Sequence, residues 1–570
     1  MAKVDLVIRG GTVADGSGAP LREADVAVSD GKIVAVGKIA ETGREEVDAR
    51  GLLVTPGFVD VHTHYDAQLT WAERLNPSSG HGVTTVVTGN CGVGFAPCRP
   101  QDRDILIRLM EGVEDIPELV MEAGLPWDWE SFPEFLNAVE KKPHDIDFAV
   151  LLPHSPLRVF AMGERAVNLE PATEADRAVM RQIAKEAMQA GAIGFGTSRS
   201  IFHQASDGSY IPTKGADEAE LDAIAAGLAD AGRGVLQAIT VTGQHHVEEY
   251  ELFHRVAQGS GRPVSYTLVQ IEARKELWRD VMGAVERDRA AGVDVKAQIF
   301  NRPVGVILGL EASFHPFCMH PYYVEHLAKL PLAQRVAEMR KPEVRAKLVQ
   351  PEGELLHPFK NQMRRFEYMF PMGKVAQYEP DLSTSVAAVA AARGVSPYEV
   401  AYDMLLEQDG HAMLLVTSAN FCDGNLDTTL EMMRHPDTVL ALGDGGAHYG
   451  VICDASYSTY TLTHWTRDRA GGKLDLARAV QMLTDVPAKL HRFRDRGRLA
   501  PGMKADINII DMDRLKLFSP SVIFDLPGGG KRLTQTAEGY VTTYVSGVAI
   551  QRDGQDTGAR PGRLVRDAGI

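Results

Sequence analysis

Two histidines spaced two residues apart are the first candidates for chemistry in this sequence. His62 and His64 follow a short apolar run at residues 58–61, which is typical of a strand. Alternate side chains of a strand share one face, so we expect both imidazoles to point toward one place. Two neutral imidazoles at a strand end suit a divalent cation such as zinc. An isolated pair could equally be polar loop residues, but here Pro56-Gly57 precedes it and Asp66 follows it.

The residues around this pair resemble a known family signature. The run PGFVDVHTH (residues 56–64) is similar to the first-strand motif of the amidohydrolase superfamily, which are metal-dependent hydrolases on a (β/α)8 barrel. Two further motifs, GNCG (residues 89–92) and GDG (residues 443–445), resemble a narrower branch, the N-acyl-D-amino-acid deacylases or D-aminoacylases. The resemblance covers essentially the whole chain. It implies a barrel, a bound divalent cation and hydrolysis of an amide bond.

Cys91 and Asp444 are the residues of these two motifs that could complete a metal site. Each follows an apolar run, and in such barrels chemistry takes place at the C-terminal ends of the strands. Cys91 could offer a thiolate, as its counterpart does in the D-aminoacylase branch, although a free cysteine is more often a small buried hydrophobic residue. Asp444 could ligate the cation and carry a proton from water to the leaving nitrogen. A turn aspartate in an Asp-Gly pair is the alternative.

Other polar residues near expected strand ends are candidate contacts of the substrate or the transition state. His448 could stabilise the transition state or orient a metal ligand. Arg199 and Arg302 could bind an anionic substrate, because a guanidinium matches a carboxylate with two hydrogen bonds. Structural ion pairing is the alternative for each arginine. His154 and His203 could line the pocket, or could be ordinary structural histidines.

The sequence departs from the D-aminoacylase pattern at the fifth and sixth strands. The branch normally has a metal-binding histidine after each, but here Ile239 and Leu268 occupy those positions and cannot bind a metal. His245 and His246 lie nearby and could substitute, or could begin a surface helix. The substrate-carboxylate clamp of the branch is not recognisable either, so D-specificity is not carried over. We therefore predict one zinc ion, or another divalent cation, rather than two. Its expected ligands are His62, His64, Cys91 and Asp444.

The order of apolar runs predicts a (β/α)8 TIM-type barrel. Eight apolar runs alternate with amphipathic stretches, which is typical of a parallel sheet covered by helices. The expected strands are residues 57–61, 84–88, 148–152, 192–196, 234–239, 264–268, 295–300 and 438–442.

The two ends of the chain are predicted to form a second, smaller domain. Residues 1–55 and 496–570 read as short strands with turns, and neither piece could bury a sheet face alone. We predict one composite β-sandwich from both, with the barrel at residues 56–495. The interval between the last two barrel runs is too long for a βα loop. We interpret residues 303–410 as an insertion over the barrel mouth that could act as a lid. The run at 413–418 could be an accessory strand or could displace one of the eight.

Composition excludes several classes of partner. The chain has 570 residues, 44% of them hydrophobic, which is enough for a large core. A net charge of −16 argues against nucleic acid or an anionic membrane surface as a partner. Five scattered cysteines indicate a reducing compartment, and there is neither a signal peptide nor an apolar run of membrane-spanning length. We expect a cytoplasmic protein with a small-molecule amide substrate, and we leave homo-oligomerisation open.

The predicted reaction is hydrolysis of a non-peptide C–N bond, most simply in an N-acyl amide. One alternative is opening of a cyclic amide or imide, or deamination. The barrel lysine that is carboxylated to bridge two metals in such enzymes is absent at the fourth strand end, where Ser198-Arg199 stands. The other alternative is a metal-free, non-catalytic scaffold. Loss of the two histidines favours a scaffold, whereas retention of His62, His64 and Asp444 opposes it.

Overall fold

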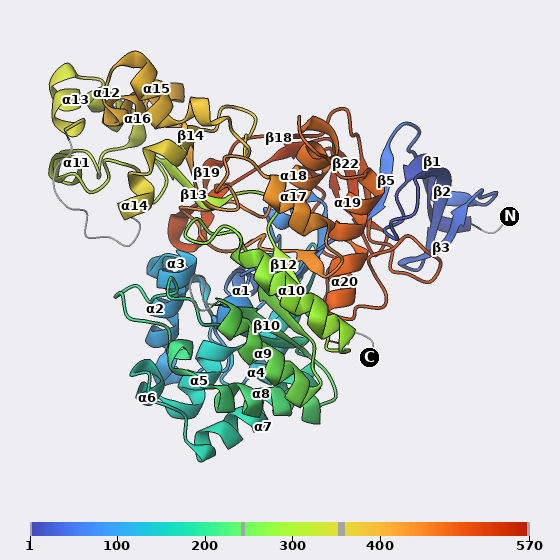
Figure 1. The fold of residues 1–570 in the computed structure, drawn as a ribbon. Coiled ribbons are helices and arrows are strands. Elements are labelled where there is room, and N and C mark those ends of the chain that lie inside the picture. Colours follow the sequence, from blue (N-terminus) through green and yellow to red (C-terminus); the bar gives the residue numbers. More distant parts are fainter. Residues whose placement is uncertain (1–2, 241–245, 351–359, 567–570) are drawn as a thin grey trace.

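The computed structural model describes residues 3–240, 246–350 and 360–566. Three parts are visible in Figure 1: a parallel barrel, a sheet that combines both ends of the chain, and a helical insertion that lies apart from the barrel. In the described part of the chain, no helix has the length and apolar character needed to cross a bilayer.

The barrel sheet has eight strands, and its seven strand pairings among the described residues are all parallel. Neighbouring strands follow one another in the order of the sequence. Each of the eight predicted runs coincides with one of them, which confirms the predicted barrel. The strands are β6 (Phe58–Asp60), β7 (Val83–Thr88), β8 (Asp147–Pro153), β9 (Gly194–Ser198), β10 (Val235–Ile239), β11 (Val264–Thr267), β12 (Val295–Ile299) and β16 (Thr438–Leu440).

The segments that follow the first and last barrel strands are joined by backbone hydrogen bonds. The amide of Asp444 donates to the carbonyl of His62 over 3.0 Å, and the amide of His64 donates to the carbonyl of Gly445 over 2.8 Å. These two bonds bring the loop after β16 against the end of β6. Residues almost four hundred positions apart in the sequence are therefore neighbours at the C-terminal edge of the barrel.

Local sequence explains why these elements form. Strand β7 reads Val-Thr-Thr-Val-Val-Thr, and all its residues are buried, as expected for β-branched residues inside a covered sheet. Helix α7 (Glu174–Ala190) begins with a capping box between Thr173 and Asp176 and ends at Gly191, whose φ of 116° suits glycine.

Helices cover the outside of the barrel and fill its connections. Helices α7, α8, α9 and α10 lie together on one side of the sheet (Figure 1). The helices of the barrel are α1 (Gln68–Trp71), α2 (Arg103–Glu114), α3 (Glu118–Gly124), α4 (Phe132–Glu140), α5 (His154–Met162), α6 (Glu164–Val167), α7, α8 (Glu218–Asp230), α9 (His246–Ser260), α10 (Leu277–Ala290), α17 (Asp427–Arg434), α18 (Tyr457–Tyr460), α19 (Leu476–Leu483) and α20 (Asp485–Leu490).

Both ends of the chain enter one nine-stranded sheet, as predicted. Strand β17 (Ile507–Ile510) pairs antiparallel with β5 (Leu53–Pro56), so the C-terminal part is hydrogen-bonded directly to the N-terminal part. Figure 1 shows the blue N-terminal strands beside red β22. The other members are β1 (Lys3–Val13), β2 (Arg22–Ser29), β3 (Lys32–Gly37), β4 (Thr42–Asp48), β22 (Tyr540–Val545), β23 (Val548–Arg552) and β24 (Gln555–Asp556). The domain boundaries at residues 55 and 496 stay a prediction.

The long interval before the last barrel strand has a core of its own. Strands β13 (Val304–Gly309), β14 (Met369–Pro371) and β15 (Met413–Ala419) form an antiparallel sheet in the order β13-β15-β14. Strand β15 is therefore an accessory strand and displaces none of the eight. The helices of this part are α11 (Pro321–His326), α12 (Leu332–Met339), α13 (Pro342–Leu348), α14 (Lys360–Met363), α15 (Val386–Arg393) and α16 (Pro397–Leu405), and apolar side chains between residues 306 and 416 pack together. Its role as a lid stays a prediction.

Candidate metal centre

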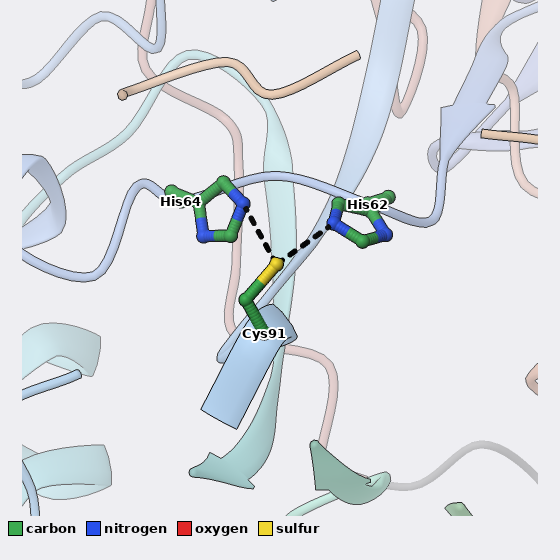
Figure 2. A group of neighbouring side chains, drawn as sticks. All are labelled: His62, His64 and Cys91. Carbon is green, nitrogen blue, oxygen red and sulfur yellow. Dashed lines mark hydrogen bonds between the residues drawn. The ribbon is translucent and has the colours of Figure 1, made fainter. Parts of the chain in front are cut away.

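Three side chains converge at the C-terminal end of the first barrel strand. His62 and His64 follow β6, and Cys91 lies in the turn directly after β7. The Cys91 Sγ atom lies 3.4 Å from Nε2 of His62 and 3.7 Å from Nε2 of His64 (Figure 2). Among the described residues, these three form the only group of three or more cysteine, histidine or carboxylate side chains with ligand atoms mutually close enough to hold one metal ion.

Asp444 places a carboxylate oxygen against the same two imidazoles. Its Oδ1 atom lies 3.6 Å from Nε2 of His62 and 3.5 Å from Nε2 of His64. Around a tetrahedral zinc ion with ordinary bond lengths, neighbouring donor atoms lie about 3.4–3.6 Å apart. The distances from both imidazoles to the Cys91 sulfur and to the Asp444 oxygen match that spacing.

The burial and the hydrogen-bond partners of the Asp444 carboxylate and the two imidazoles are also compatible with a bound cation. Asp444 Oδ1 is buried and has no hydrogen-bond partner among the described residues, a costly arrangement for a carboxylate unless something else binds it. The side chains of His62 and His64 are 1% exposed, whereas that of Asp444 is 15% exposed. The site is therefore dry around the histidines and opens to solvent beside the carboxylate. The donor set of nitrogen, sulfur and oxygen atoms fits zinc.

The backbone is strained at both non-histidine residues. Cys91 has a φ of 57° and Asp444 a φ of 47°, values that residues with a side chain adopt rarely. Such conformations persist where the surrounding structure imposes them, and they cluster at functional sites. At Gly92, beside Cys91, an added Cβ would lie 2.9 Å from the Cα of Thr197, so a side chain there would collide with β9. The turn holding Cys91 thus needs glycine on its C-terminal side.

Two buried glutamines of the barrel strands hydrogen-bond to two of these residues, His62 and Cys91. Gln298 of β12 accepts a hydrogen bond from Nδ1 of His62 over 2.8 Å, which places the imidazole proton on Nδ1 and leaves Nε2 free to bind a cation. Gln237 of β10 accepts from the backbone amide of Cys91 over 3.2 Å. We did not predict either residue. A polar side chain within an otherwise apolar barrel strand is the signal that could have identified both.

Glu114 is a further carboxylate that the sequence did not indicate. It is the last residue of α2, and its side chain is 1% exposed. Its Oε1 atom lies 3.3 Å from Nδ1 of His64, and its Oε2 atom lies 3.4 Å from Nε2 of His448. In the sequence Glu114 looks like an ordinary charged residue of an amphipathic helix, so no local pattern would have found it.

Burial controls the protonation of this cluster. Desolvation lowers the pKa of His62 to about 4 and that of His64 to about 3, so both imidazoles are neutral near neutral pH and can act as ligands. Burial, and then the charges of Glu114 and Asp444, raises the pKa of the Cys91 thiol well above its ordinary value. A cation among these groups would reverse that preference and favour the thiolate.

His448 and His203 lie beside the centre. The ring centroid of His448 is 6.2 Å from that of His64, and its backbone φ is 52°. Burial lowers the pKa of His448 to about 4. Burial and then the nearby imidazoles of His64 and His62 lower the pKa of His203 to about 3, which places it in the same electrostatic environment. The structure thus brings His448 against His64, and the imidazoles of His64 and His62 contribute to the lowered pKa of His203.

The other predicted substrate contacts already have partners within the protein. Both ring nitrogens of His154 are hydrogen-bonded, to Thr197 and to Glu220, each over 2.8 Å. Arg199 pairs with Glu249 over 2.7 Å. These contacts are the structural alternative for both residues, and their role as substrate contacts stays a prediction without support from the geometry.

Arg302 is likewise engaged inside the protein. Its side chain is fully buried and donates to Asp454 over 2.6 Å, to the carbonyl of Cys453 and to Ser456. The guanidinium also lies 3.9 Å from the ring centroid of Tyr378. A guanidinium with this many partners would have to release them before it could bind a substrate carboxylate.

The fifth and sixth strands end in aliphatic residues, as their sequences indicated. Ile239 is the last residue of β10. Leu268 lies directly after β11; it is buried, and its backbone amide donates to the backbone carbonyl of Gln298. His245 lies outside the described residues. His246 begins α9, and its Nε2 atom lies 3.4 Å from Thr240 Oγ1. In the part of the chain that the structure describes, the metal-type side chains therefore cluster at one place.

Comparison with known proteins identifies the family. The model of the amidohydrolase family matches residues 45–550. A D-aminoacylase from Alcaligenes xylosoxydans xylosoxydans is 26% identical over 98% of this chain and 97% of its own length. An N-acyl-D-aspartate deacylase from the same organism is 40% identical, but that match spans 34% of this chain and 37% of the relative.

A solved structure shares the fold over the whole chain. The N-acyl-D-glutamate deacylase from Bordetella bronchiseptica, complexed with zinc and a phosphonate mimic of the tetrahedral intermediate, superposes with a TM-score of 0.64. It is 23% identical, and the match covers 99% of this chain and 100% of that one. The family match and these relatives confirm the predicted hydrolase class, acting on non-peptide C–N bonds. The chain belongs to the amidohydrolase family.

Proposed function

We propose that this protein removes the acyl group from N-acyl-D-amino acids at a site that holds one divalent cation, with zinc as the first candidate. The observation that carries the proposal is that Nε2 of His62 and Nε2 of His64 each lie 3.4–3.7 Å from both the Cys91 sulfur and the Asp444 Oδ1 atom. The proposed ligands are His62, His64, Cys91 and Asp444.

The comparisons support the substrate class and the metal. The full-length relative is a D-aminoacylase, the partial relative acts on N-acyl-D-aspartate, and the deacylase of the solved structure binds zinc. The single cluster of metal-type side chains in the described residues, together with Ile239 and Leu268 at the fifth and sixth strands, supports one ion rather than two.

The residues of this chain suit the proton transfers that amide hydrolysis requires. When bound, the cation would have to accept a water molecule in addition to its protein donors; it would lower the pKa of that water and polarise the acyl carbonyl. Water adds to the carbonyl carbon, the C–N bond breaks, and one proton of that water must reach the leaving nitrogen. Asp444 suits this transfer because its side chain is 15% exposed and contacts both imidazoles, whose side chains are 1% exposed. His448, on the same loop, faces the same space and could stabilise charge on the reacting carbonyl oxygen.

Of the predicted substrate contacts, we retain His203. It is only partly buried, and one of its ring nitrogens, Nδ1, has no hydrogen-bond partner among the described residues. Its pKa is lowered in part by the nearby imidazoles of His64 and His62, which supports a position close to the centre. It could therefore donate to or accept from the substrate.

The test is the Asp444→Asn variant. Purified wild-type protein should contain about one equivalent of zinc and hydrolyse members of a panel of N-acetyl-D-amino acids faster than their L-enantiomers. The variant should keep the fold by circular dichroism and lose about 10²–10⁴-fold in kcat, the usual contribution of a general acid–base group. Asp104→Asn, which removes an exposed carboxylate from α2, is the matched control. Unchanged turnover in the Asp444 variant would refute its role, and a metal-free, inactive wild type would favour the scaffold alternative.

A further inference from the structure

Glu114 is a buried carboxylate beside the metal centre to which the proposed function gives no task. Both its oxygen atoms are buried and have no hydrogen-bond partner that satisfies ordinary angles among the described residues. An unpartnered buried carboxylate is costly, and such groups usually indicate a functional constraint. The nearest polar atoms are two imidazole nitrogens, Nδ1 of His64 and Nε2 of His448.

The backbone holds Glu114 in this place independently of its side chain. The amide of His448 donates to the carbonyl of Glu114. The next residue, Asp115, accepts from the amide of Gly450 over 2.8 Å and from Ser313 of the insertion over 3.2 Å. The end of α2 is thus tied to the loop that carries Asp444 and His448. This attachment brings the Glu114 carboxylate between the two imidazoles.

We propose that Glu114 is a positioning residue that fixes the orientation of His64 and His448 at once; this inference rests on the proposed function. Its carboxyl group presents Oε1 to Nδ1 of His64 and Oε2 to Nε2 of His448. When His64 binds a cation through Nε2, the proton of its ring stands on Nδ1, and Oε1 of Glu114 lies where it can accept that proton in a hydrogen bond.

The observed geometry is consistent with a contact that tightens when the centre is complete. Distances of 3.3 and 3.4 Å are slightly long for charge-assisted hydrogen bonds. In structures without substrate, catalytic hydrogen bonds are often long or poorly aligned, and they shorten on binding. Outer carboxylates that accept from a ligating histidine raise its basicity, and their loss typically costs about 10–100-fold in metal affinity or activity.

The experiment uses the full-length protein with cobalt as a spectroscopic probe. Glu114→Gln keeps the volume of the side chain but leaves a single oxygen atom for the two imidazoles. We expect cobalt affinity to fall about 10–100-fold, the visible absorption bands of bound cobalt to shift, and kcat to fall more than KM rises. Glu114→Asp keeps both oxygen atoms and should recover part of each loss. Asp104→Asn, on the exposed side of the same helix, should match the wild type.

The outcomes separate this inference from the proposed function. Cobalt affinity and absorption bands of Glu114→Gln that match those of the Asp104→Asn control would overturn the inference, even if the wild type is an active deacylase. A wild type that binds cobalt but hydrolyses no N-acyl amino acid would refute the proposed function, and the spectra would still decide the role of Glu114. A wild type that binds no cobalt overturns the inference. If Glu114→Gln does not fold, the affinity and absorption bands of Glu114→Asp decide, and values equal to the wild type's refute the positioning role.

Discussion

Replacing Cys91 with serine is the sharpest test of the metal centre. The substitution exchanges a sulfur donor for a hydroxyl in a side chain that is only 5% exposed, and it leaves His62, His64 and Asp444 in place. The sulfur lies 3.4 and 3.7 Å from the two imidazole nitrogens, whereas the shorter C–O bond would withdraw the donor atom from that position. A neutral hydroxyl is also a much weaker zinc ligand than a thiolate.

The magnitude follows from the number of donors. Loss of an outer partner of a metal ligand already lowers affinity about 10–100-fold, so loss of one of four direct donors should cost at least about 100-fold, or about 2.8 kcal/mol. A buried hydroxyl in place of a thiol could also destabilise the fold by about 1–3 kcal/mol. Cys98→Ser is the matched control, because Cys98 is 2% exposed and is not part of the metal-type cluster.

Two assays measure the effect. Competition with a zinc chelator gives the affinity of the wild type and both variants. Cobalt substitution reports the ligand directly, because a thiolate bound to cobalt produces a sulfur-to-metal charge-transfer absorption. We expect that absorption in the wild type and in Cys98→Ser and its loss in Cys91→Ser. Wild-type zinc affinity in Cys91→Ser, or a wild type without the absorption, would show that Cys91 is a buried apolar residue.

Three further predictions concern the surroundings of the centre and the fold. Gln298→Leu should lower zinc affinity about 10-fold in the same chelator competition, because His62 loses the acceptor that holds its Nδ1 proton; unchanged affinity would contradict this. Burial opposes ionisation of Glu379, but hydrogen bonds from Arg469 and other donors hold its pKa at about 2, below the ordinary value of 4.5. The lowered pKa corresponds to about 3.4 kcal/mol, which solvent screening at this partly exposed group reduces to about 2 kcal/mol; this stabilisation is complete above pH 4.5 and lost as the pH falls toward 2. Urea unfolding should show Glu379→Gln less stable than the wild type at neutral pH, with the difference vanishing in acid; a constant difference would refute the reasoning. Gly92→Ala should lose about 1–3 kcal/mol in thermal unfolding, because φ is +70° and the added Cβ meets β9; an unchanged midpoint would contradict it.

The fold could be predicted from the sequence because each barrel strand leaves a local pattern that is repeated along the chain. Each buried parallel strand has both faces covered, so it reads as a short apolar run, and eight such runs separated by amphipathic stretches could be counted. The composite sheet was predictable for a different reason: neither terminal piece has enough residues to bury a sheet face alone. The sheet to which β15 belongs could not be predicted in the same way, because an apolar run indicates a buried strand but not its neighbours.

The proposed ligands were also visible locally. His62 and His64 share a strand face by their spacing, and Cys91 and Asp444 each lie in a glycine-flanked motif at a strand end. In a barrel the C-terminal ends of all strands meet at one edge, so residues at those ends can be expected to gather even when they are far apart in the sequence.

What only the tertiary structure decided is which polar groups meet. Gln298 lies 236 positions from His62, and Glu114 reaches His448 from the end of a helix whose own pattern looks ordinary. The same holds for Arg302, whose strand-end position is compatible with substrate binding but whose buried partners occupy its guanidinium. Strand and helix formation depend on the spacing of neighbours along the chain, and the sequence therefore determined the barrel and the edge at which the candidate ligands lie. Hydrogen bonding between side chains depends on which residues are neighbours in space, and only the tertiary structure determines those neighbours.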